Sequence, residues 1–187
     1  MKQTTLLAGL AAAISLFTLS GVAQAVGLDG LYFGLDAQQW QLEYDGLDDE
    51  YKDTTARIRL GYDVSRYFGI EAQLSGGGSD TLTYGPLSDE LELDYLAGLY
   101  LKGVLPVNSD FQIYALAGVS HAKATETLTY GNATYRASDR DSNPGIGLGV
   151  EIDVNELFSL NADIMRHSIG ATDYDLDTFA GGFNYHW

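Results

Sequence analysis

Ala56-Arg57-Ile58-Arg59-Leu60-Gly61-Tyr62 alternates apolar side chains with two arginines and a glycine. Consecutive side chains of a β-strand point to opposite faces of the sheet, so this stretch predicts a strand with one apolar face and one charged face. An arginine on the lipid-facing side of a membrane barrel costs about 2–4 kcal/mol at the bilayer midplane. If the strand lies in a membrane, Arg57 and Arg59 therefore face away from the lipid and the apolar set faces it.

Seven further runs of the chain alternate in the same way. With the first stretch they cover residues 30–40, 54–63, 67–76, 91–102, 111–121, 143–152, 157–166 and 176–187. Short turns at 63–66, 103–110 and 153–156 interleave with long polar segments at 41–53, 77–90, 122–142 and 167–175. No stretch after residue 25 approaches the run of about 20 apolar residues that a membrane-spanning helix needs. An even strand count with alternating short and long connections predicts an all-β fold, an eight-stranded antiparallel up-and-down transmembrane β-barrel.

The polarity of the two faces distinguishes this barrel from a water-soluble one, which would turn its apolar face inward. Here the face opposite the apolar set carries the charges, and we expect these residues to line the lumen: Asp36, Arg57, Arg59, Glu71, Glu92, Asp94, Lys102, Glu151 and Asp163. The termini and short turns are then expected in the periplasm, and the long acidic loops outside the cell.

Two interpretations of the lumen charges are open. They form either an ion-pair network that plugs the lumen or a narrow pore gated by a pair such as Arg59 and Glu71. Eight strands leave room for side chains and little else, which favours the plug. If the turn after Tyr62 is centred on Ser65, Arg59 falls opposite Glu71 across the hairpin.

The first 25 residues have the features of a secretory signal peptide. Lys2 precedes an apolar stretch at 6–17, and Ala23-Gln24-Ala25 supplies a small-x-small cleavage site. We expect cleavage between Ala25 and Val26. The predicted organisation is a signal peptide over 1–25 and an outer-membrane β-barrel domain over 26–187, exported to the outer membrane of a Gram-negative bacterium.

Composition excludes several classes of protein. The 187 residues include no cysteine, which excludes a disulfide scaffold, a thiolate zinc site and a cysteine nucleophile. A net charge of −16 argues against nucleic-acid binding. The acidic loops lack the Asp-x-Asp-x-Asp-Gly spacing of a calcium site, so we expect a solvated acidic surface and no tight metal binding. No cofactor is expected.

A five-residue repeat occurs in two of the long segments. Thr81-Leu82-Thr83-Tyr84-Gly85 recurs as residues 127–131, and the flanks of Gly131-Asn132 alternate, which predicts a hairpin that extends above the membrane. The repeat is either shared strand composition, which we favour because the match is short, or a paired recognition surface with exposed tyrosines.

The chain resembles the small eight-stranded outer-membrane barrels of Gram-negative bacteria, of the opacity-protein and outer-membrane-protein-A transmembrane-domain type. The resemblance rests on residues 59–63, 114–119 and 145–151 and on the ending Phe183-Asn184-Tyr185-His186-Trp187. It implies that Phe183, Tyr185 and Trp187 form a C-terminal signal for the assembly machinery, although Trp187 stands where phenylalanine is more usual. The chain stops at the eighth run, so a peptidoglycan-binding domain is not expected.

The expected function is that of a non-enzymatic surface barrel with a structural or adhesive role through its long loops. Expected partners are outer-membrane lipid, lipopolysaccharide and a host or cell-surface ligand, with the barrel as a monomer. A narrow low-conductance channel is the first alternative. A lipid A-modifying enzyme is the second, but adjacent His167 and Ser168 point to opposite faces of a strand and cannot share a proton.

Overall fold

Antiparallel strands make up almost all of the described chain. The structure is a computed structural model that describes residues 29–44, 50–85, 87–131, 133–168 and 174–187. Its strands are β1 (Leu31–Tyr44), β2 (Glu50–Ser65), β3 (Phe68–Gly76), β4 (Ser79–Tyr84), β5 (Leu87–Pro106), β6 (Phe111–Tyr130), β7 (Ala133–Asp153), β8 (Phe158–Ser168) and β9 (Tyr174–His186). Among the described residues, no helix has the length and apolar content to span a membrane.

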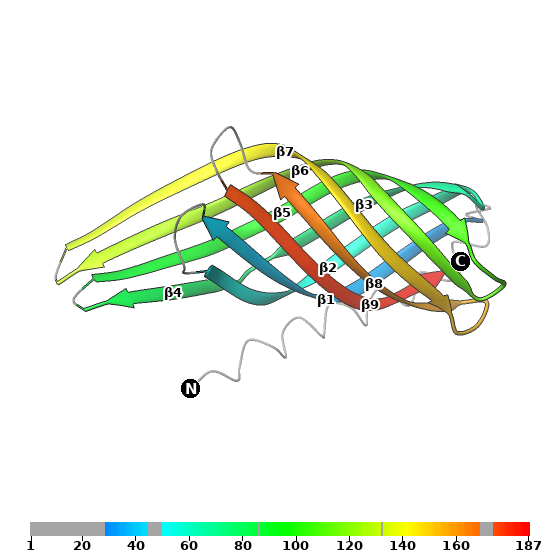
Figure 1. The fold of residues 1–187 in the computed structure, drawn as a ribbon, viewed down its shortest axis with the longest axis horizontal. Helices are drawn as coiled ribbons and strands as arrows, with labels where there is room; N and C mark the ends of the chain where they lie inside the picture. Colours follow the sequence, from blue (N-terminus) through cyan, green and yellow to red (C-terminus); the bar gives the residue numbers. More distant parts are fainter. Residues whose placement is uncertain (1–28, 45–49, 86, 132, 169–173) are drawn as a thin grey trace.

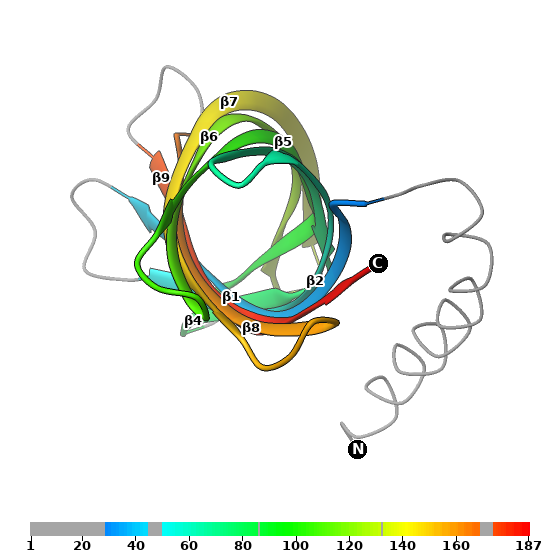
Figure 2. The same cartoon turned by 90° about the vertical axis from the view of Figure 1, so that its right-hand side faces the viewer.

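The strands close into a barrel, which Figure 2 shows end-on as a ring. The sheet runs in the order β3-β2-β1-β9-β8-β7-β6-β5-β4, and pairing of β3 with β5 closes it. β3 and β4 pair with consecutive parts of β5 and are separated only by Gly77 and Gly78, whose φ angles are +80° and +124°. They therefore fill a single position in the ring, and the predicted eight-stranded antiparallel barrel is confirmed.

The middle of the barrel has the predicted inversion of polarity. Ile58, Leu60 and Leu74 are exposed on the outer surface, while Arg57 and Glu71 are buried. Burial along β3 alternates strictly from one residue to the next. The apolar outer face suits lipid, and the polar inner face fills the lumen.

Three of the predicted short turns lie at one end of the barrel. They connect β2 to β3, β5 to β6 and β7 to β8, at the right-hand end in Figure 1, where the C-terminus also lies. The hairpin register at the first turn differs from the prediction, because Arg59 lies opposite Gln73 and Gly61 lies opposite Glu71. The position of the turn is the reason, because Ser65 pairs with Phe68 and the chain therefore turns at Arg66 and Tyr67, beyond Ser65.

At the opposite end, strands continue through two segments that were predicted to be loops. Four strands extend past the barrel in Figure 1: β4 and residues 87–93 of β5, 124–130 of β6 and 133–139 of β7. We call these residues the external sheet. The predicted hairpin around Gly131 is confirmed, because Tyr130 pairs with Ala133. In the other two predicted loops, 41–53 and 167–175, the strands continue through 41–44, 50–53, 167–168 and 174–175, and residues 45–49 and 169–173 lie outside the described residues.

The two copies of the repeat occupy equivalent places in the external sheet. Each ends on a glycine at the tip of a two-residue hairpin turn, Gly85 with φ +63° and Gly131 with φ +58°. These φ values favour glycine. Both copies therefore consist of residues typical of strands followed by a glycine, and the same hairpin geometry requires that glycine in each.

The polarity of the strands reverses where they leave the membrane-facing zone. On β1, Asp36 and Gln38 point inward below, whereas Trp40 and Leu42 point inward above and Gln39 lies on the outer face. The inward apolar residues form a cluster, which we call the mouth layer: Trp40, Leu42, Tyr51, Leu91, Leu93, Leu96, Ala122 and Leu176. The barrel therefore has a polar lumen and an apolar core at its outer mouth.

Candidate functional site: the charge network of the lumen

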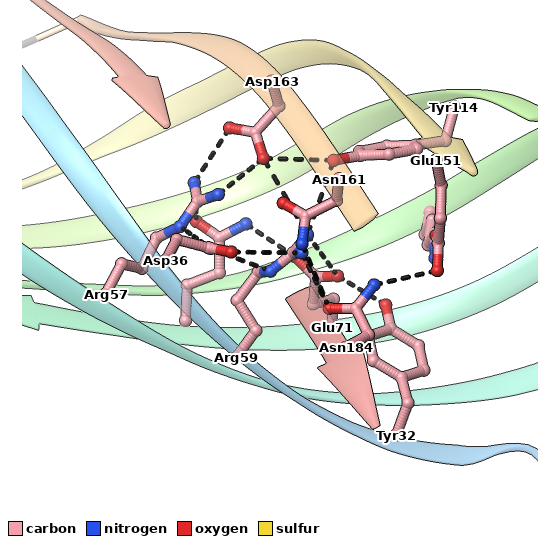
Figure 3. Close-up of polar contacts among 12 residues, drawn as sticks. Tyr32, Asp36, Arg57, Arg59, Glu71, Tyr114, Glu151, Asn161, Asp163 and Asn184 are labelled. Carbon is pink, nitrogen blue, oxygen red and sulfur yellow. Dashed lines mark hydrogen bonds and ion pairs between the residues drawn. The ribbon is translucent and has the colours of Figure 1, made fainter. Parts of the chain in front are cut away.

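Arg57 of β2 lies at the upper end of the buried network. Its Nε is 2.8 Å from Oδ2 of Asp36 on β1, and its terminal nitrogens donate to both carboxylate oxygens of Asp163 on β8, at 2.9 and 2.5 Å. Figure 3 shows this two-pronged contact across the lumen. Bidentate pairing of a guanidinium with a carboxylate is among the strongest charge-assisted contacts in proteins. Arg57 therefore ties β2 to its neighbour β1 and to β8, a strand with which β2 does not pair.

Arg59 lies one inward position lower and shares acidic partners with Arg57. Its Nε is 3.0 Å from Oδ2 of Asp36, one terminal nitrogen is 3.6 Å from Oε2 of Glu71, and the other donates to Oδ1 of Asn184 at 2.8 Å. Glu71 also accepts hydrogen bonds from the Tyr32 hydroxyl and from Gln73. The Arg59–Glu71 ion pair exists despite the shifted register, because the long arginine side chain reaches diagonally.

A second group lies nearer the short turns and is centred on Glu151 of β7. Lys102 contributes an ion pair at 3.1 Å, Asn184 donates a hydrogen bond at 2.8 Å, and the Ser159 hydroxyl donates another. The Lys102 ammonium also lies 4.5 Å from the centre of the Tyr32 ring, a cation–π contact. Through Asn184, this group is continuous with the partners of Arg59.

The network is closed to solvent and nearly balanced in charge. Its three cations face four carboxylates, and each of these side chains is at most 1% exposed. Ionised groups removed from water are costly unless geometry and hydrogen bonds compensate, and removal of one partner leaves an uncompensated charge. Within the described part of the chain, these ionised side chains contact one another and their hydrogen-bond partners, an arrangement that can hold the strands together.

The structure brings together seven of the nine predicted lumen residues: Asp36, Arg57, Arg59, Glu71, Lys102, Glu151 and Asp163. It places Glu92 and Asp94 elsewhere. Asp94 is the extra residue of a β-bulge on β5, so Leu91 and Leu93 point inward above it and Glu92 points outward, 3.4 Å from Arg136. Asp94 binds Lys123 at 3.2 Å and the Thr125 hydroxyl at 2.7 Å at the rim.

Uncharged members of the network escaped the sequence prediction. Tyr32, Gln73, Tyr114 and Asn184 all lie in the lumen and bind its charges. Each occupies the inward phase of its strand, so the alternation contained the signal. The expected lumen residues were the charged ones alone, so these four uncharged side chains were not among them.

The C-terminal aromatic residues lie on β9 or directly after it. Phe183 pairs with Leu35, and Tyr185 makes edge-on contacts with Phe158 and Trp187 at centroid distances of 5.3 and 5.1 Å. The backbone N–H of Trp187 donates to the carbonyl of Leu31 at 3.2 Å. These contacts join the end of the chain to β1 and β8. Ala25 and Val26 lie outside the described residues.

Among the described residues, the cluster of Glu151, Asp153 and His186 and the buried His167 have the chemistry of metal ligands or catalytic bases. Donor atoms of Glu151, Asp153 and His186 lie within 4.8 Å of one another, a spacing that could hold a cation. The Glu151 carboxylate is, however, already occupied by Lys102, Ser159 and Asn184. His167 is buried in the barrel with Nδ1 3.5 Å from the Tyr100 hydroxyl. Neither group presents the exposed nucleophile and base pair that hydrolysis needs.

Comparison with solved structures finds the same architecture in small outer-membrane barrels. The attachment invasion locus protein Ail of Yersinia pestis has a TM-score of 0.61 at 14% identity, covering 85% of this chain and 99% of Ail. Neisserial surface protein A has a TM-score of 0.62 at 16% identity, covering 85% and 98%. OprG of Pseudomonas aeruginosa has a TM-score of 0.57 at 15% identity, covering 86% and 97%. At these identities the likeness establishes the fold.

Comparison of the sequence with curated proteins gave no match. A family profile described as "Outer membrane protein beta-barrel domain" matches residues 9–186. The match spans nearly the whole sequence and agrees with the inverted polarity of the barrel. The chain is therefore an outer-membrane β-barrel that belongs to the outer membrane protein beta-barrel domain family.

Proposed function

We propose that this protein is a non-enzymatic surface barrel whose membrane part is a closed anchor and whose external sheet makes the functional contacts. The observation that carries the proposal is the solvent-free charge network, in which each ionised side chain is at most 1% exposed. A plugged lumen leaves the surfaces outside the barrel as the places where a partner can bind. The predicted structural or adhesive role follows from this division between a closed membrane part and an external sheet that is free to make contacts.

The external sheet has features that suit a contact surface. Tyr130 and Tyr135 are 64% and 67% exposed there, and exposed tyrosines provide large contact areas at low entropic cost. Ail of Yersinia pestis has been solved in complex with the heparin analogue sucrose octasulfate. This chain has a net charge of −16, which disfavours a polyanionic ligand. We propose a neutral or basic surface as the partner, on a host or another cell.

We also propose how the chain is exported and assembled. Cleavage between Ala25 and Val26 releases the barrel over 26–187 into the periplasm. The aromatic side chains of Phe183, Tyr185 and Trp187 guide its assembly, and the barrel then resides as a monomer among outer-membrane lipid and lipopolysaccharide. The acidic loop residues act as a solvated surface and hold no metal tightly.

Single-channel recording in planar bilayers tests the closed lumen. The refolded mature chain is compared with Arg59→Ala and with Arg66→Ala, a control at an exposed turn. We expect no discrete openings from the native chain or from the control. Openings of the native chain that Arg59→Ala alters would identify a gated pore and overturn the proposal.

An adhesion assay tests the external sheet. Bacteria that express the native barrel are compared with a Tyr130→Ser/Tyr135→Ser variant for autoaggregation and for binding to an epithelial layer. Tyr67→Ser, at an exposed turn on the other end, is the control. We expect loss of binding in the double variant alone. Equal binding by all three at equal surface expression contradicts the proposal.

A further inference from the structure

The outer mouth contains a cavity that the proposed function does not use. It has a volume of about 440 Å³ and lies above the lumen network, between β1, β5, β6, β7 and β9. One side is apolar, formed by Trp40, Leu42, Leu91, Leu93, Ala122, Ala124 and Leu176. The other side is formed by Glu126 of β6 and by residues 137–139 and 141 of β7.

The apolar side is a well-packed wall. Trp40 and Leu176 are 1% exposed and Leu93 is 5% exposed. These side chains belong to the mouth layer, which packs as a core independent of the charges below it. A buried apolar wall of this kind favours the nonpolar part of a small molecule.

The opposite side is acidic, and the pairing of strands explains why. Ala122 pairs with Asp141, and Ala124 pairs with Asp139, so both aspartates share a face with the apolar residues of β6. Residues directly opposite on neighbouring strands point to the same side of the sheet. Glu126 pairs with Leu91 of the same wall. Three carboxylates therefore border the cavity.

The cations of the same hairpin lie on its other face. Lys123 pairs with Arg140 and binds Asp94 at 3.2 Å, and Arg136 lies 3.4 Å from Glu92. Within the described part of the chain, Glu126, Asp139 and Asp141 have no ion-pair partner. The hairpin thus separates charge by face, cationic outward and anionic toward the cavity. A positively charged group in the cavity would find unneutralised carboxylates.

We infer that the mouth cavity binds a small amphipathic cation, with its apolar body against the Trp40 wall and its amine toward Asp139 and Asp141. The inference goes beyond the adhesive role and does not depend on it. The lumen network closes the barrel below, so the cavity is a blind binding site. The natural occupant is a molecule with an apolar chain or ring and one protonated amine.

Tryptophan fluorescence can report occupancy directly. The chain has two tryptophans, Trp40 in the cavity wall and Trp187 at the opposite end of the barrel. In Trp187→Phe, refolded into lipid nanodiscs, Trp40 is the single reporter. The probes are 4-phenylbutylamine, 4-phenyl-1-butanol and 4-phenylbutyrate, which share an apolar body and differ in charge. Trp40→Phe, which retains Trp187, reports partition of each probe into the lipid.

We expect a saturable change in Trp40 emission with the amine, affinity for the alcohol weaker by roughly tenfold, and no saturation with the acid. Trp187 should show no saturable change. Asp139→Asn/Asp141→Asn should remove the preference of the amine over the alcohol. Glu90→Gln/Glu92→Gln changes the net charge equally on the outer face and should leave the preference unchanged. Each variant is first checked for folding by circular dichroism.

Three outcomes overturn the inference. Equal saturation by the amine and the alcohol would mean that the carboxylates do not select the ligand. Equal loss of preference in the two double variants would mean that net charge alone attracts the amine. Absence of a saturable change in a folded Trp187→Phe protein would mean that the cavity does not bind such molecules.

Discussion

The lumen and the outer mouth are built from the same strands with opposite patterning. On β1, Asp36 points inward and its neighbour Leu35 faces the lipid. Four residues further along the strand, Trp40 points inward and its neighbours Gln39 and Gln41 face outward. Lipid demands an apolar outer face, which leaves polar side chains for the interior. Water imposes no such demand, so above the membrane the strands form an ordinary apolar core. The environment of the outer face therefore decides what the interior can be.

Removal of a lumen cation should have the largest effect. In Arg57→Met, the carboxylates of Asp36 and Asp163 lose the guanidinium that binds both, at 2.8 and 2.5 Å. We expect a loss of about 3–5 kcal/mol in the free energy of unfolding, because a buried charge is left without its partner. Urea unfolding in lipid vesicles measures the loss.

The matched control is Arg136→Met in the external sheet. Arg136 also forms an ion pair, with Glu92 at 3.4 Å, but both side chains are largely exposed. We expect a loss below about 1 kcal/mol, as for other surface pairs. Equal losses for the two variants would show that the lumen network does not stabilise the barrel more than a surface pair does.

Truncation in the mouth layer tests its role as a core. Leu93 is buried among apolar side chains, and Leu93→Ala should cost about 2–3 kcal/mol through lost contacts and a new cavity. Leu157→Ala, at an exposed turn, should change the free energy of unfolding by less than about 1 kcal/mol. If Leu93→Ala costs no more than this control, the mouth is not packed as a soluble core.

Close packing across the lumen predicts an intermediate effect. A Cβ atom on Gly149 would lie 2.3 Å from the ring of Tyr114, whereas one on Gly103 would meet nothing within 4 Å. Gly149→Ala should therefore destabilise the barrel by about 1–3 kcal/mol through overpacking. Gly103→Ala should be nearly neutral. Similar unfolding midpoints for both variants would argue that the lumen has room to spare.

The difference between the lumen and the outer mouth also explains which parts of the structure could be predicted from the sequence. Alternation placed Arg57, Glu71 and Asp163 inward because lipid tolerates only one orientation of such strands. It failed for Glu92, because one extra residue at the Asp94 bulge reverses the phase of β5 and leaves no mark in the pattern. The hairpin register at the first turn differs by two residues because the turn lies at Arg66 and Tyr67 and not at Ser65. Both errors occur where a bulge or a turn position changes the pairing without changing the alternation of the sequence.

The smallest expected effect is a pH dependence of the free energy of unfolding, which arises at the Asp94 bulge. The hydroxyl of Thr125 donates a hydrogen bond to the Asp94 carboxylate, and together with Lys123 it holds the pKa of Asp94 below its usual value. A lowered pKa in the folded state stabilises the fold at neutral pH, and this contribution is lost as the pH falls through the usual carboxyl range and below. Thr125→Val should therefore reduce the free energy of unfolding by a few tenths of a kcal/mol at about pH 7, because Asp94 is partly exposed, and by less at about pH 3.

Unfolding curves of the native chain and Thr125→Val at the two pH values measure this difference. Thr134→Val, on the exposed strand across the β6–β7 hairpin, is the matched substitution and should show no dependence on pH. If Thr125→Val costs equally at both pH values, Thr125 stabilises the bulge through packing alone. In that case the ionised carboxylate of Asp94 does not maintain the bulge that turns Leu91 and Leu93 toward the mouth. The packing of the mouth layer itself must then hold the bulge in place.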